Sequence, residues 1–110
     1  MNDSTTIEKK KQVLDKCWTL FYIVKDLEAA GIEIINAQVG DRCYVLIHCR
    51  GDHAEFRRWA NSQGLEITVE PAVITDPDYG LHWKIGTNVC GFEVHGWMTD
   101  QNKEEYDATV

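Results

Sequence analysis

The sequence is poor in basic residues and lacks the short motifs that mark many catalytic and cofactor sites. Lys and Arg number 11 against 18 Asp and Glu, which gives a formal net charge of −7 at pH 7. A field of this sign repels nucleic acid and anionic membranes and favours basic partners. No GxGxxG, GxxxxGK[ST], HExxH, HxH or CxxC pattern occurs. We therefore expect a protein that is not an enzyme, has no cofactor or metal and binds no nucleic acid directly.

Long apolar runs are also missing. Residues 17–24 form the most apolar stretch, but Lys25 and Asp26 end it far short of the roughly 20 residues that a membrane span needs. No Ala-x-Ala cleavage site follows it, so we expect an unprocessed cytoplasmic protein without a membrane association. The four cysteines are expected to be reduced thiols that are buried, except for Cys90, which is predicted to lie exposed in a hairpin loop. They are Cys17, Cys43, Cys49 and Cys90.

Two segments have the periodicity of helices. Apolar residues recur at three- and four-residue steps from about Thr6 to Ala30, and Gly31 supplies the stop. In the second half of this helix the apolar residues spread past one face, so it needs more than one surface to pack on. We therefore expect a long core helix that lies across the sheet. A second helix is predicted to end at Gln63, before Gly64, with a buried stripe. That stripe is Phe56, Trp59 and Ala60.

Five segments have the patterns of strands, and the chain is organised around the second. The strands are predicted at 32–39, 42–49, 65–70, 81–86 and 91–98. Residues 42–49 are apolar on both faces, which indicates a strand covered on two sides by its own chain or by a partner. The register of the first hairpin stays open: a two-residue turn places Ala37 beside Tyr44, whereas a three-residue loop places it with Val45.

The last hairpin allows a register to be predicted. If Gly86 lies opposite Gly91, a four-residue loop joins the strands, Lys84 meets Glu93, and His82 lies directly opposite His95. In this arrangement the apolar residues of both strands share the core face. They are Trp83, Ile85, Phe92 and Val94.

The element order α-β-β-α-β-β-β predicts an α+β fold. We expect a two-layer single domain over residues 1–98, with two helices packed on one face of a mostly antiparallel five-stranded sheet. Residues 99–110 are acidic and polar and are predicted to form a disordered tail.

The outward face of this sheet is the candidate binding surface. Large aromatics and histidines gather there, a composition typical of protein interfaces, and an open apolar sheet face is otherwise an aggregation hazard. We therefore predict a partner-binding surface for a basic protein or for a second copy of the chain. Its residues are Tyr44, Leu46, His48, His82, Glu93, His95 and Trp97.

Two other functions stay open. His82 and His95 as neighbours could bind a metal or an anionic small molecule, since imidazole suits both tasks. The chain could also be a structural homo-oligomer whose subunits meet through the sheet face. In size, charge and layout it is similar to small accessory proteins of phages and mobile elements, including immunity proteins and inhibitors. That similarity includes no motif and transfers no residue role, so the favoured hypothesis is an acidic intracellular protein that occludes a basic target.

Overall fold

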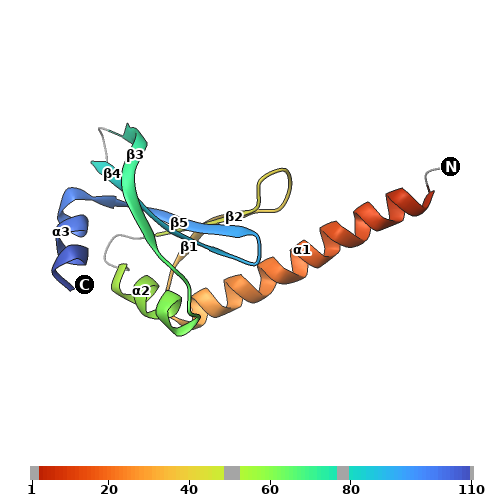
Figure 1. Ribbon diagram of the computed structural model, residues 1–110, viewed down its shortest axis with the longest axis horizontal. Coiled ribbons are helices and arrows are strands. Elements are labelled where there is room, and N and C mark those ends of the chain that lie inside the picture. Colours follow the sequence, from red (N-terminus) through yellow and green to blue (C-terminus); the bar gives the residue numbers. More distant parts are fainter. Residues whose placement is uncertain (1–2, 49–52, 77–79, 110) are drawn as a thin grey trace.

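The computed structural model describes residues 3–48, 53–76 and 80–109, and the predicted α+β fold is confirmed (Figure 1). The sheet has five strands, and the order α-β-β-α-β-β-β is followed by a third helix. The elements are α1 (Asp3–Ala29), β1 (Ile34–Gln38), β2 (Tyr44–Ile47), α2 (His53–Ser62), β3 (Thr68–Asp76), β4 (Leu81–Val89), β5 (Phe92–Thr99) and α3 (Asp100–Thr109).

The sheet is mostly antiparallel, with one parallel pair at its centre. Its strand order is β1-β2-β5-β4-β3, and β2 runs parallel to β5. The parallel pair requires a crossover, which passes through α2, β3 and β4. Helices α1 and α2 lie on the same side of the sheet, and α3 lies beside the far end of β5 (Figure 1).

The core fills the space between the sheet and these helices. Val45 of β2 and Ile85 of β4 are fully buried, and Phe56 and Ala60 of α2 cover them from the helical side. The predicted core face of the last hairpin is confirmed for three of its four residues, which are Ile85, Phe92 and Val94. Trp83 is half-buried and packs against the same cluster.

The predicted register of the last hairpin was wrong by four residues. Val89 pairs with Phe92, so the connection has two residues, and both Cys90 (φ 51°) and Gly91 (φ 82°) have positive φ. Two positive φ values are what a tight type I′ turn requires. A non-glycine residue is uncommon in that conformation, which is why the sequence pattern favoured a longer loop.

The register of the first hairpin is close to the second of the two predicted alternatives, in which Ala37 lies with Val45. Ala37 pairs with Val45, so the two residues share the core face, although the connecting loop is longer than three residues. A bulge between Ile34 and Asn36 turns Ile35 outward, where 56% of it is exposed. The bulge adds one residue to β1 and so changes the alternation along that strand.

Strand β3 also continues beyond its predicted end. Pro71 was expected to stop it, but the strand runs to Asp76, with Pro71 opposite Trp83. β3 is an edge strand, and proline is tolerated at an edge because the missing N–H can lie on the unpaired side.

The predicted disordered tail is instead helix α3. Thr99 and Asn102 exchange hydrogen bonds at its start: the Asn102 N–H donates to Thr99 Oγ1 (3.1 Å), and the Thr99 N–H donates to Asn102 Oδ1 (3.2 Å). This reciprocal pair has the geometry of a capping box. Farther along α3, the Tyr106 ring packs under the Arg57 guanidinium at 4.2 Å, and Arg57 Nη2 donates to the Tyr106 carbonyl oxygen (2.8 Å). Capping and packing together hold a segment whose composition alone indicated disorder.

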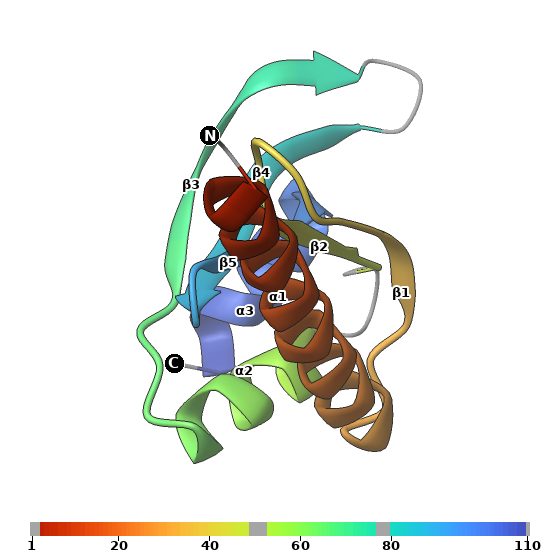
Figure 2. The ribbon, with the colours of Figure 1, turned by 90° about the vertical axis from the view of Figure 1, so that its right-hand side faces the viewer.

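Helix α1 projects away from the rest of the chain. Its 27 residues span about 40 Å, yet among residues 6–29 only Ile23 and Leu27, both near the C-terminal end, are buried. The prediction of a core helix lying across the sheet was therefore wrong for the N-terminal part of α1. The N-terminal half extends past the strands in Figure 1 and points toward the viewer in Figure 2. No helix within the described ranges is long and apolar enough to cross a membrane.

Candidate protein-binding face

The sheet face opposite α1 and α2, which we call the open face, presents a row of aromatic side chains. Parallel pairing places Tyr44 beside Glu93 and Leu46 beside His95. The His95 ring then lies between two other rings, with centroid distances of 5.8 Å to Tyr44 and 5.9 Å to Trp97. Because these side chains come from two adjacent hydrogen-bonded strands, their spacing is fixed by the sheet.

His95 is more buried than the sequence predicted. Only 8% of it is exposed, although it belongs to the open face. The residue opposite is Gly86, and a Cβ there would lie 3.1 Å from the His95 Cβ, so the glycine permits the close approach of the two strands at His95. Burial lowers the pKa of His95 even though the Glu93 carboxylate opposes this shift, which favours a neutral ring at pH 7.

An ion-pair network borders the rings. Glu93 Oε1 lies 2.5 Å from Lys84 Nζ and 3.2 Å from His95 Nδ1. Lys84 and Glu93 are not directly opposed as predicted: Lys84 pairs with Trp97 in the register, and its side chain reaches Glu93 diagonally. The hydrogen bond from Lys84 lowers the pKa of Glu93, so the carboxylate is ionised at neutral pH.

Two cations of this face lie near aromatic rings. Lys84 Nζ is 5.9 Å from the Trp97 ring centroid, and the Arg42 guanidinium carbon is 6.0 Å from that of Tyr44. Both distances are within the range of a cation–π attraction. The contacts restrain Tyr44 and Trp97 while leaving each of them partly exposed.

A shallow polar hollow of about 160 Å³ lies beside the rings, toward β3. Glu70 and Thr68 of the edge strand contribute to it, together with Lys84 and Glu93. Its polar groups can accept and donate hydrogen bonds at the rim of an interface, where polar contacts are usual.

His82 does not belong to this group, contrary to the prediction. It lies in a bulge between Leu81 and Trp83, four residues along β4 from the partner of His95, which is about 13 Å. Its Nδ1 is 3.0 Å from Asp100 Oδ2, and Trp83 Nε1 donates to the other oxygen of Asp100 (2.8 Å). These two hydrogen bonds lower the pKa of Asp100. His82 therefore fastens the start of α3, and the two-histidine site loses its geometric basis.

The other predicted residues of this face have more modest roles. Leu46 is half-buried between Asn36 and His95, and His48 is half-buried just after β2. Within residues 3–48, 53–76 and 80–109, no three His, Cys, Asp or Glu side chains are grouped as a metal site would need. The sequence did not identify Arg42 and Gly86 as part of this face, because the residues that they contact depend on the strand register.

Comparison of the chain with protein-family models, with curated proteins and with solved structures finds no match. The function of the chain is therefore inferred from the geometry of the described residues.

Proposed function

We propose that this protein is a non-enzymatic binding protein whose open face covers a basic surface of another protein. The observation that supports it best is the ring row of Tyr44, His95 and Trp97 on the side of the sheet away from α1 and α2. Tyrosine and tryptophan are the residues most enriched at the energetic centres of protein interfaces.

The rings are ordered before any partner arrives. His95 is buried between Tyr44 and Trp97, and Lys84 and Glu93 hold the neighbouring ion pair. Binding therefore costs little side-chain entropy, which leaves more of the contact energy as affinity. A rigid aromatic centre with a polar border has the anatomy of a specific interface.

The charge of the chain favours a basic partner. The net charge is −7, and Lys84, a cation of this face, is already paired with Glu93. Glu70 on the adjacent edge strand and Asp41 in the β1–β2 loop are both exposed. Such a field accelerates association with a basic surface and opposes association with nucleic acid. Inhibition of a basic enzyme or of a nucleic-acid-binding protein is the action that this surface suits.

A reducing compartment suits the cysteines. Cys17, Cys43 and Cys90 are free thiols, and Cys17 and Cys90 are exposed. Exposed thiols persist in the cytoplasm and are oxidised outside it, so we place the protein in the cytoplasm.

The test is capture of the partner from the cells that produce the protein. Tagged wild-type protein is compared with the double variant Tyr44→Ala/Trp97→Ala and with Val13→Ala, which removes an exposed apolar side chain from α1 as a control. Loss of one interface aromatic typically costs about 2 kcal/mol or about thirtyfold in affinity, so the double variant should lose the partner.

Two further measurements accompany the capture experiment. Thermal unfolding establishes that the double variant is folded, and added salt should weaken the complex, because screening reduces the attraction between an acidic and a basic surface. Equal recovery of the same partner by the folded double variant and by the wild-type protein would refute the proposal.

A further inference from the structure

Helix α1 carries a stripe of exposed apolar side chains, among which the rings of Trp18 and Tyr22 each pack edge-on against Phe21. Trp18 is 60% exposed, Leu14 59%, Tyr22 64%, Ile7 52% and Phe21 48%. These are among the largest apolar side chains of the protein, and their exposure is far above that of the core-facing Ile23 and Leu27. A continuous apolar surface of this kind marks a site of association.

The stripe has the spacing of a helix–helix seam. Residues 7, 11, 14, 18, 21 and 25 follow one another at steps of four and three, and at 100° per residue they fall within a band about 80° wide. On the same helical wheel Ile23 and Leu27 lie roughly opposite this band, so the seam is directed away from the sheet. It is interrupted only by Lys11 and Lys25.

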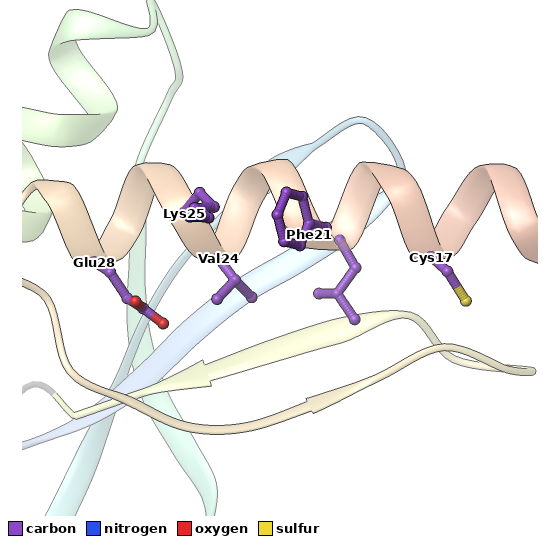
Figure 3. A pocket seen from close by; sticks show the side chains of 6 residues that line it. Cys17, Phe21, Val24, Lys25 and Glu28 are labelled. Atoms are coloured by element: carbon purple, nitrogen blue, oxygen red, sulfur yellow. The ribbon is translucent and has the colours of Figure 1, made fainter.

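The apolar surface continues around one flank of the helix. A hollow of about 360 Å³ lies along α1, lined by residues that include Leu20 and Phe21, with Lys25 and Glu28 toward its C-terminal end. In Figure 3 Cys17 and Val24 point toward the strands, whereas Phe21 does not. These strand-facing groups therefore lie beside the seam and not on it.

We propose that α1 pairs with α1 of a second copy of this chain, and that the two helices run antiparallel. The charged residues along α1 determine whether the two helices run parallel or antiparallel. In a parallel pair each seam lysine would meet its own copy, Lys11 against Lys11 and Lys25 against Lys25. In an antiparallel pair with Trp18 near Phe21 of the second copy, Lys11 lies against Glu28, and Lys25 lies near Leu14.

The available area fits a dimer. An aromatic side chain can bury about 150–250 Å², so at the observed exposures each seam residue offers roughly 100 Å². Two copies together then bury on the order of 1,000 Å² of apolar surface, before the lysine stems are added, which approaches the area of specific interfaces. The seam faces away from the sheet, so the pairing leaves the open face of each copy uncovered and is independent of the proposal made for it.

The test measures oligomeric state by sedimentation equilibrium from sub-micromolar to high micromolar concentration. Wild-type protein should dimerise, and Trp18→Glu, which buries a carboxylate in the middle of the seam, should weaken the dimer at least a hundredfold. Ile35→Glu is the matched control, because Ile35 is an equally exposed apolar residue on β1 outside the seam. It should leave the dimer unchanged.

A charge exchange tests the direction. Lys11→Glu and Glu28→Lys should each weaken the dimer, and the double variant should restore it, as only antiparallel pairing brings these residues together. Wild-type protein that stays monomeric, a dimer that Ile35→Glu disrupts as strongly as Trp18→Glu, or a double variant without rescue would each overturn the proposal. Binding of the stripe to anionic vesicles by a monomer would overturn it as well.

Discussion

Replacement of Leu27 by alanine tests how α1 is held to the rest of the chain. Leu27 is fully buried and belongs to the core that includes Ile32 and Phe56. Full burial of a leucine side chain contributes about 1.5–3 kcal/mol, and the cavity left by truncation raises the cost of Leu→Ala to about 2–5 kcal/mol. Because Ile23 is the only other buried residue among residues 6–29, this loss should weaken the attachment of the helix.

Leu14→Ala is the matched control, since it makes the same chemical change on the same helix at a position that is 59% exposed. In dilute solution it should cost less than about 0.5 kcal/mol, as surface substitutions usually do. Urea unfolding followed by tryptophan fluorescence measures both variants. A cost below about 1 kcal/mol for Leu27→Ala, or equal costs for the two variants in dilute solution, would refute the described attachment of α1. If α1 pairs with a second copy, the cost of Leu14→Ala should rise with protein concentration.

Three further predictions concern the sheet and α3. Acidification from pH 7 to 5 should lower the free energy of unfolding, because burial lowers the pKa of His95 from its ordinary 6.5 and the unfolded chain therefore binds the proton first; His95→Gln should flatten this part of the pH profile, and an unchanged profile would contradict the assignment. Gly86→Val should displace the His95 ring, with a loss of about 1–3 kcal/mol, and an unshifted His95 NMR spectrum would argue against the close approach. Tyr106→Ala should speed amide exchange throughout 100–109, and exchange already fast in the wild-type protein would show that α3 is not docked.

Alternation and helical period were enough to predict most of the fold. The spacing of Ile85, Phe92 and Val94 predicts which residues of the last hairpin are buried, and the apolar repeats and terminal glycines of α1 and α2 predict these two helices. An error in register leaves each residue on its predicted face of the sheet whenever the shift is an even number of residues. The four-residue error therefore left the open face correct while it separated His82 from His95.

The parts that could not be predicted depend on contacts between distant segments. The burial of His95 requires Gly86 opposite it, and α3 requires Arg57 of α2 beneath Tyr106. Composition carries no sign of either contact. The spacing of the α1 seam could have been predicted, because Ile7, Leu14 and Phe21 follow one another at intervals of seven residues. Its exposure could not, because only the projection of the helix past the strands shows that the strands do not cover this face.

The central claim, that the open face binds a protein, is tested most directly by site-specific photocrosslinking in the cells that produce the chain. One variant carries a photoreactive phenylalanine in place of Trp97, and a second carries it in place of Arg58, whose side chain is 73% exposed on α2, on the other side of the sheet. We expect a crosslink to a basic protein from position 97 and none from position 58. The same crosslinks from both positions, or a partner captured from position 58 alone, would contradict it.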